Sequence, residues 1–306
     1  MVPLERNSFL YPFTRLGLGF AAFLAVSQLA AQLLSWLAFH LSPALLSSPW
    51  GIWFLNDLSI YGFGLAALLL VLWTMPVYPP ACRDRMTPAS FSAIAMAAFG
   101  LMYLANLVTL LLLGALSAME GKPFANGTIE TVSSMPFLPN FVFGVILAPI
   151  LEELVFRKLL LDRVRHWGDR LSILISALFF ACYHTNLFQF FYAFAVGALF
   201  AYLTLRTGTV RYSILLHGLI NLVGVGLAPL LEQFPPAAAL SGLWVLACLG
   251  VGGWQCWKFW KRRVLLEGPA PYSVGQKVSL FFRNPGTLLF LGLSLLLSLL
   301  NLGIFY

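Results

Sequence analysis

Three short patterns place ionisable or hydrogen-bonding side chains one helical turn apart inside long apolar stretches. The first pattern contains Glu152, Glu153 and Arg157. On a helix, Glu153 and Arg157 form an i, i+4 pair with the acid on the N-terminal side, which is the favourable order for an ion pair. Glu152 lies about 100° further round the helix, so we expect its carboxylate to stay outside that pair and to face a cavity. The same residues would also fit an ion-pair cluster that only holds two helices together.

The other two patterns each contain a histidine. Phe180 and His184 share one face of a helix at i, i+4, and His217 and Asn221 do the same further along the chain. The second of these pairs directs two hydrogen-bonding side chains toward one point. Taken alone, His184 would fit a residue that bridges two helices, and His217 with Asn221 would fit polar contacts between membrane helices.

The composition indicates what kind of chain surrounds these residues. Hydrophobic residues make up 60% of the 306 residues and charged residues only 9%, against about 45–50% and about 25% in soluble domains. The 27 Phe, 10 Tyr and 9 Trp exclude a disordered chain. The four cysteines form no C-x-x-C spacing and are interpreted as small apolar residues. The sequence therefore predicts an all-α polytopic membrane protein, whose net charge of +7 concerns orientation and anionic lipid and not nucleic acid.

Apolar runs long enough to cross a bilayer occur nine times, since about 20 apolar residues are required. Eight spans are the alternative, because the fifth run is the shortest. The predicted runs are 16–41, 53–75, 90–117, 137–162, 171–187, 189–206, 211–230, 236–257 and 285–305.

The basic residues orient these spans. With the N-terminus in the cytoplasm, inside segments contain 16 of the 18 Lys and Arg residues. Of the other two, Lys122 falls in an outside loop and Arg157 within a span. Cytoplasmic loops collect basic residues, so we expect a cytoplasmic N-terminus.

Depth in the membrane brings the patterns together. At 1.5 Å per residue, Glu152, His184, His217 and Asn221 lie roughly 16, 21, 9 and 15 Å from the basic ends of their helices. Ionisable groups at such depth cost several kcal/mol unless they are paired or solvated, and they usually serve a function. A carboxylate, two imidazoles and an amide at one level supply a general base, a water-orienting group and oxyanion donors. Those parts suffice to hydrolyse an amide without a covalent intermediate.

The three patterns, in this order, resemble the signature of the CAAX protease and bacteriocin-processing family, also called CPBP or Abi, of intramembrane glutamic endopeptidases. The stretch 205–210 ahead of His217 also resembles the usual lead-in to the third motif. The resemblance covers roughly residues 90–230, the expected catalytic helical core. Residues 1–89 would form N-terminal membrane helices outside it, and residues 231–306 a C-terminal helix pair with a basic cytoplasmic loop at 258–283.

The resemblance implies roles for seven residues. Glu152 would activate water with help from His184, and His217 and Asn221 would stabilise the tetrahedral oxyanion. The supporting residues would be Glu153, Arg157 and Phe180. No cofactor is expected, although a carboxylate with two histidines could bind zinc. The metal-free mechanism is preferred because an amide is a poor zinc ligand and Glu153 is expected to pair with Arg157.

The implied substrate is a membrane-associated peptide or protein, either prenylated or of the leader, pheromone or bacteriocin type. In a bacterium the enzyme would lie in the plasma membrane, with its active site on the cytoplasmic side. Two alternatives remain open: a non-catalytic self-immunity or scaffold protein, and a proton-coupled transporter. The sequence makes no prediction of oligomeric state.

Overall fold

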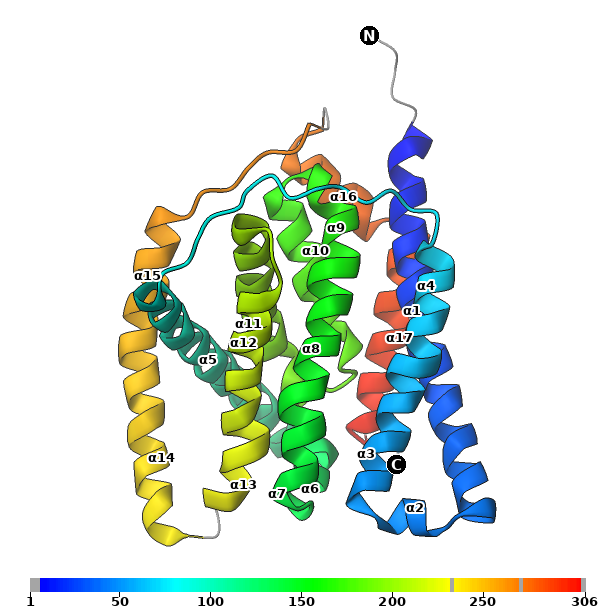
Figure 1. Cartoon of the computed structure of the whole chain (residues 1–306), viewed down its shortest axis with the longest axis vertical. Coiled ribbons are helices and arrows are strands. Elements are labelled where there is room, and N and C mark those ends of the chain that lie inside the picture. The colour runs from blue at the N-terminus through cyan, green and yellow to red at the C-terminus, as the bar shows by residue number, and fades with distance from the viewer. Residues whose placement is uncertain (1–5, 232–233, 270–271, 304–306) are drawn as a thin grey trace. The chain divides into compact units, whose positions relative to one another are not determined.

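A computed structural model describes residues 6–231, 234–269 and 272–303. These residues form helices, joined by turns and extended segments and by one isolated antiparallel bridge between Gly168 and Glu267. Figure 1 shows the helices in chain order. The predicted all-α class is confirmed.

Seven helices among the described residues are long and apolar enough to span a membrane, so the chain is an integral multi-pass membrane protein. A further pair, Val274–Phe282 and Pro285–Asn301, is bent by 62° and makes eight if it counts as one span. The seven are Tyr11–Leu41, Pro49–Leu72, Pro88–Glu120, Phe137–Trp167, Leu187–Thr207, Arg211–Leu231 and Ala239–Arg262.

Two predicted segments differ from the structure. The fifth run forms α10 (Asp169–Tyr183), whose 15 residues extend only about 22 Å, short of the hydrocarbon thickness of about 30 Å. Among the described residues the count is therefore seven or eight, which includes the predicted alternative of eight spans. Part of the stretch expected to be a basic loop is helical, because Ser273 and Gln276 form a reciprocal capping box that starts α16 (Val274–Phe282).

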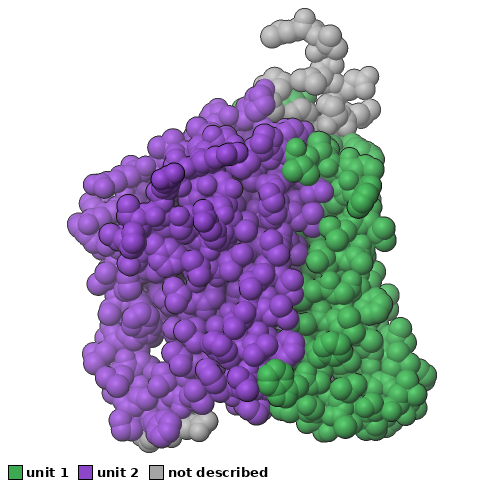
Figure 2. Space-filling view, in the orientation of Figure 1, with its two compact units in different colours: residues 1–77, 271–297 green, residues 78–270, 298–306 purple. Residues whose placement is uncertain are grey.

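The chain divides into two compact units, which Figure 2 colours separately. Unit 1 comprises Met1–Val77 and Pro271–Leu297, and unit 2 comprises Tyr78–Ala270 and Ser298–Tyr306. The three-part division expected from the sequence follows the extent of the family resemblance rather than compactness, and it stays a prediction.

The long helix α1 (Arg6–Leu41) packs against most of the other elements of unit 1. The other elements are α2 (Ala44–Ser47), α3 (Pro49–Asp57), the π-helical η1 (Leu58–Gly64), α4 (Leu65–Leu72), α16 and most of α17 (Pro285–Asn301). Buried phenylalanines on α1 pack edge-on against this C-terminal pair, with Phe13 5.5 Å from Phe281 and Phe20 5.7 Å from Phe290 between ring centroids.

Unit 2 contains all three sequence patterns. Its elements run from α5 (Pro88–Glu120) through α6 (Gly127–Ser134), α7 (Phe137–Pro139), η2 (Asn140–Leu147), α8 (Ala148–Glu153), η3 (Leu154–Leu160), α9 (Leu161–Val164), η4 (Arg165–Trp167), α10, α11 (Leu187–Thr207), α12 (Arg211–Asn221), η5 (Leu222–Leu227), α13 (Ala228–Leu231), α14 (Pro235–Ala247) and η6 (Cys248–Gly252) to α15 (Gly253–Arg262).

Helix α11 is the central packing element of unit 2. It contacts α5, α10, α12 and η3, and Phe200 on it is fully buried in an apolar cluster with residues of α5 and α12. Its ends are fixed locally: Asn186 accepts the Phe188 N–H at 2.9 Å as N-cap, and Gly208 ends it with φ +68°. Helix α11 thus packs against both the segment η3, which carries Arg157, and the histidine helix α12.

Candidate active site

The acidic pattern lies where an α-helical turn changes to a π-helical one. Glu152 and Glu153 end α8, and Arg157 lies in the π-helical segment η3 that follows. A second π-helical segment, η5, begins directly after Asn221 on α12. Such wider turns are frequent at functional sites. Two of them adjoin the patterns here, and three others, η1, η2 and η6, lie outside the patterns.

The ion pair that the i, i+4 spacing predicts is present. Arg157 Nη1 lies 3.2 Å from Glu153 Oε1, and both side chains are fully inaccessible. The guanidinium of Arg157 lies 4.2 Å from the centroid of the Phe180 ring and 5.6 Å from that of Phe200. Aromatic faces therefore cover a desolvated cation, an arrangement that favours it electrostatically.

Gly197 makes room for this arginine on α11. Arg157 Nη2 donates to the Gly197 carbonyl at 3.4 Å. A β-carbon at position 197 would lie 3.0 Å from Phe180 Cδ1 and 3.3 Å from Arg157 Nη2. A larger residue would push the ring or the guanidinium away from its place.

His217 connects the two adjacent acids. Its Nδ1 lies 3.0 Å from Glu153 Oε1, and its Nε2 lies 3.6 Å from Glu152 Oε2. Because an ionised carboxylate only accepts hydrogen bonds, Nδ1 donates to Glu153. In the neutral ring, Nε2 is then the unprotonated nitrogen, and it faces Glu152. Glu153 thus fixes both the orientation and the tautomer of His217.

The two acids differ in exposure. The Glu153 side chain is fully buried, whereas the Glu152 side chain keeps 11% of its accessible area. Glu153 is in contact with Arg157 and His217 together. Of the two acids, only Glu152 therefore keeps an accessible edge.

His184 belongs to the same cluster through Phe180. The Phe180 ring lies 4.8 Å from the His184 ring and 5.7 Å from the His217 ring, edge-on to both. His184 Nδ1 lies 2.8 Å from the Phe180 carbonyl, which can only accept, so this nitrogen donates and Nε2 is left as the acceptor. Glu152, His217 and Arg157 all act electrostatically on His184.

Asn221 lies one turn beyond His217 on α12. Its amide nitrogen donates to the Gly144 carbonyl in η2 at 2.9 Å. This bond uses one of its two N–H donors and fixes the plane of the amide.

The structure therefore gathers six of the seven predicted residues around Arg157 and His217, with Asn221 on the same helix as His217. The sequence paired Glu152 with His184, which interact electrostatically, and the structure adds His217, whose Nε2 lies 3.6 Å from Glu152 Oε2. Sequence reasoning did not find Gly197 or Phe200. It also missed Tyr192 on α11, which is close enough to Glu152 to interact with it electrostatically. An aromatic or glycine in an apolar span gives no signal that distinguishes it from a lipid-facing residue.

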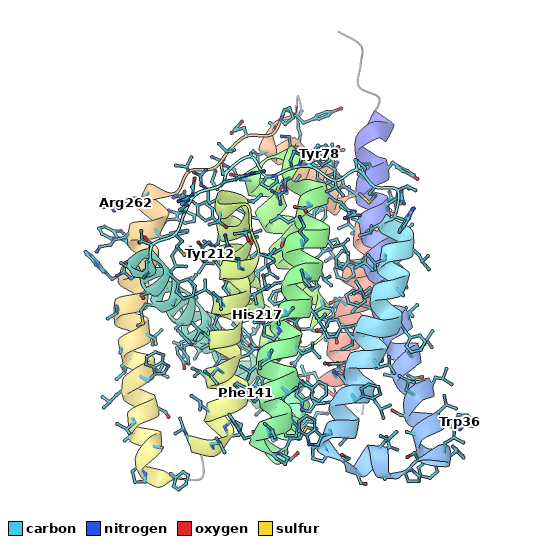
Figure 3. All side chains as sticks on the ribbon, viewed as in Figure 1. Trp36, Tyr78, Phe141, Tyr212, His217 and Arg262 are labelled. Atoms are coloured by element: carbon cyan, nitrogen blue, oxygen red, sulfur yellow. The ribbon has the colours of Figure 1, made fainter. Side chains whose placement is uncertain are left out.

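The cluster lies away from the ends of the membrane-spanning candidates that carry it. In Figure 3, His217 lies between the level of Tyr212, toward the end of unit 2 that carries Tyr78 and Arg262, and the level of Phe141. In the part of the chain that the structure describes, no group of three His, Cys, Asp or Glu side chains has the geometry to hold a metal ion.

Comparison with known families identifies this same region. Residues 134–223, which include all three patterns, match the family described as type II CAAX prenyl endopeptidase Rce1-like. No curated protein and no solved structure matches the chain significantly. The family match confirms the CAAX protease resemblance, and it supports a membrane endopeptidase in general terms.

Proposed function

We propose that this protein hydrolyses a peptide bond of a membrane-associated peptide or protein and that Glu152 activates the attacking water molecule. The premise is the match of residues 134–223 to the Rce1-like family. The observation that carries the proposal is the contact of His217 with both acids, at 3.0 Å to Glu153 and 3.6 Å to Glu152. This geometry leaves Glu152 and the free nitrogen of His217 facing one another at a partly accessible position.

The first chemical step is proton removal from water. A water hydrogen-bonded to Glu152 and to His217 Nε2 gives a proton to the carboxylate as its oxygen attacks the scissile carbonyl carbon. The carbonyl π electrons move to oxygen, and a tetrahedral oxyanion results. Glu152 then passes its proton to the leaving nitrogen as the C–N bond breaks, which yields a carboxylic acid and an amine. General acid–base transfer of this kind contributes about 10²–10⁴-fold to the rate.

The oxyanion is stabilised by donors on α12. Asn221 has a second N–H beyond the one bound to Gly144, and its amide plane is already fixed. His217 supplies a second donor when Glu152 passes the proton taken from water to its Nε2, 3.6 Å away. That proton returns to Glu152 before it goes to the leaving nitrogen. His184, with its unprotonated nitrogen near the negative charge of Glu152, assists proton movement from the other side.

Glu153, Arg157 and Phe180 act as positioning residues. Glu153 holds His217, Arg157 neutralises Glu153, and Phe180 covers Arg157 while contacting both imidazoles. None of the three needs to touch the substrate. Their burial keeps His217 directed at Glu152.

We place the cleaved bond at the cytoplasmic side of the bilayer. This assignment is supported by the concentration of basic residues in the expected inside loops. Substrates that carry a lipid or a hydrophobic segment would reach the site from the membrane. The protein would act in the plasma membrane of a bacterial cell.

The experiment that tests the proposal compares the C-termini of membrane peptides by mass spectrometry in cells with wild-type protein and in cells with Glu152→Gln protein at equal abundance. We expect a set of shortened peptides in the wild-type cells that is absent from the variant cells. Purified protein in vesicles should then cleave those peptides without added metal. Identical peptide sets, or activity abolished by a chelator and restored only by zinc, would contradict the proposal.

A further inference from the structure

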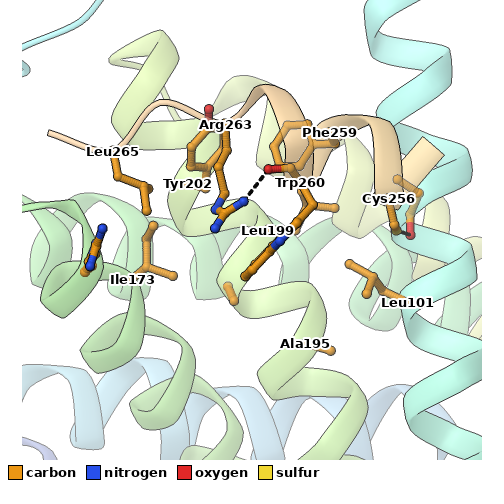
Figure 4. Close-up of a pocket in the computed structure, with 13 residues that line it drawn as sticks. Leu101, Ile173, Ala195, Leu199, Tyr202, Cys256, Phe259, Trp260, Arg263 and Leu265 are labelled. Carbon is orange, nitrogen blue, oxygen red and sulfur yellow. Dashed lines mark hydrogen bonds between the residues drawn. The ribbon is translucent and has the colours of Figure 1, made fainter. Parts of the chain in front are cut away.

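Unit 2 contains an apolar cavity of about 570 Å³ that no catalytic residue lines. Four helices enclose it: α5 contributes Leu101, α10 contributes Ile173, α11 contributes Leu199, and α15 contributes Phe259. Figure 4 shows these side chains converging on the space from opposite sides. The volume falls within the range of about 300–1,000 Å³ that is typical of sites for small organic ligands.

Among the described residues, arginines are the only charged ones that line this cavity. Arg170 and Arg263 belong to its lining, together with Tyr202 and Trp260, whereas the other lining side chains are apolar apart from Cys256. The Tyr202 hydroxyl accepts the Val264 N–H at 3.3 Å. The cavity thus combines an apolar interior with two cations in its wall.

Neither arginine is neutralised by a carboxylate of the described residues, since none lies within ion-pairing distance of either guanidinium. The Arg263 guanidinium lies 3.4 Å from the centroid of the Trp260 ring. It also donates to the Trp260 carbonyl, which fixes its direction. Arg170 is exposed at the start of α10. Two uncompensated guanidinium groups at an apolar cavity are complementary to a ligand with an anionic head and an apolar tail.

The end of α15 shows at which membrane level this cavity lies. Trp254 and Trp257 stack on one another with centroids 4.9 Å apart. Lys258 lies 5.0 Å from the Trp254 ring, and Lys261 lies 3.9 Å from the Trp257 ring. Exposed tryptophans interleaved with lysines mark the headgroup level of a bilayer. Arg263, one residue beyond α15, is therefore at headgroup level, and the apolar lining extends toward acyl-chain depth.

We propose that this cavity binds an anionic phospholipid, with an acyl chain between α5, α10, α11 and α15 and the phosphate against Arg170 and Arg263. The site is separate from the catalytic proposal, because it shares no residue with the acid–histidine cluster. It can be tested by binding alone, whatever the activity of the protein proves to be.

The test is native mass spectrometry of the purified full chain in detergent, titrated with phosphatidylglycerol or with phosphatidylcholine of the same acyl chains. We expect preferential retention of phosphatidylglycerol. Each basic residue near an anionic headgroup contributes about fivefold in affinity, so Arg170→Gln with Arg263→Gln should reduce phosphatidylglycerol binding roughly 25-fold and leave phosphatidylcholine unchanged. Equal binding of the two lipids by the wild type would overturn the proposal.

The matched control is Lys261→Gln with Arg262→Gln, which removes the same charge at exposed positions of α15 that do not line the cavity. This control should retain phosphatidylglycerol affinity within about twofold. Loss of affinity equal to that of the arginine variant would show a diffuse charge effect and would contradict a built site. If the double arginine variant folds poorly, Arg170→Gln alone, at an exposed position, should still give the fivefold loss.

A second variant tests the apolar part of the site. Ala198→Phe fills the cavity from α11 and should abolish retention of phosphatidylglycerol, whereas Ala239→Phe at an exposed position of α14 should not. Inorganic phosphate at millimolar concentration should not displace the lipid. Three results would each refute a phospholipid site. Phosphate alone could displace the lipid, a prenylated peptide could bind in preference to lipid, or Ala198→Phe could bind phosphatidylglycerol fully.

Discussion

Two helix contacts, one in each unit, use glycine for different purposes. In unit 1, a β-carbon on Gly17 would lie 2.0 Å from the carbonyl carbon of Gly286, so α1 and α17 touch backbone to backbone. In unit 2, the atoms nearest to a β-carbon on Gly197 belong to the Phe180 ring and the Arg157 guanidinium. The first glycine permits close packing of two helices, and the second permits a charged side chain to lie between helices.

The polar groups at the two contacts differ in the same way. At the unit 1 contact, Asn284 donates to the Thr14 hydroxyl at 2.9 Å, a neutral bond of the kind that holds membrane helices together. At the unit 2 contact, Glu152, Glu153, Arg157 and His217 are all buried, which costs free energy unless each charge is compensated. Packing alone does not require such a cluster. The comparison therefore supports the proposal that the second contact, unlike the first, has a chemical role.

The largest expected effect on stability is at Arg157. Arg157→Ala leaves Glu153 buried without its cation and should reduce the free energy of unfolding by about 3–5 kcal/mol. Thermal melts in detergent should show a strongly lowered Tm and a low folded yield. Arg206→Ala is the control, because it removes an arginine from the more exposed ion pair with Asp84 and should cost only about 0–1 kcal/mol. Equal losses of unfolding free energy in the two variants would show that the buried ion pair stabilises the protein no more than the exposed one.

A smaller effect is expected at Asn221, and it should concern turnover. Asn221→Ala removes an oxyanion donor. The loss of transition-state stabilisation should be about 2.7–4 kcal/mol, which lowers kcat and leaves KM nearly unchanged. Asn140→Ala is matched to it, since Asn140 also donates its amide to a backbone carbonyl, that of Val132 at 2.8 Å. The control should lose similar stability but keep its kcat. A raised KM with unchanged kcat in Asn221→Ala would count against the oxyanion role.

The smallest effect tests the unit 1 contact. Gly17→Ala forces a methyl group against the backbone of α17 and should cost about 1–3 kcal/mol of stability, without changing kcat of the folded fraction. Gly292→Ala on α17 meets nothing within 4 Å and should be neutral or stabilising, because alanine favours the helix by about 1 kcal/mol. If Gly17→Ala changed kcat but not Tm, the division of roles between the two contacts would be wrong.

Much of this architecture could be predicted because apolar run length and i, i+4 spacing are local properties. The helical class, seven of the predicted spans and the Glu153–Arg157 pair follow from them. The contact of His217 with Glu153 joins residues 64 positions apart, and it depends on how α12 packs on α8. The same holds for Gly197, whose place beside Arg157 is set by the packing of α11.

The bend between α16 and α17 escaped prediction, whereas the fifth run, which forms α10, was expected to be the shortest. The stretch 274–282 has only nine residues, too few for a span. Its capping box is too short a signal to separate a helix from a loop. The π-helical turns beside Glu153 and Asn221 have no sequence pattern of their own. They form where tertiary contacts stabilise a wider turn.

The central claim is that two adjacent glutamates have different tasks, and one paired measurement tests it. The Tm in detergent and the single-turnover cleavage rate are measured for Glu152→Gln and Glu153→Gln, which make the same chemical change one residue apart. We predict that Glu152→Gln keeps the wild-type Tm and loses about 100-fold or more in rate, whereas Glu153→Gln lowers the Tm because Arg157 is left buried and uncompensated. An active Glu152→Gln protein, or a Glu153→Gln protein with wild-type stability, would contradict the account.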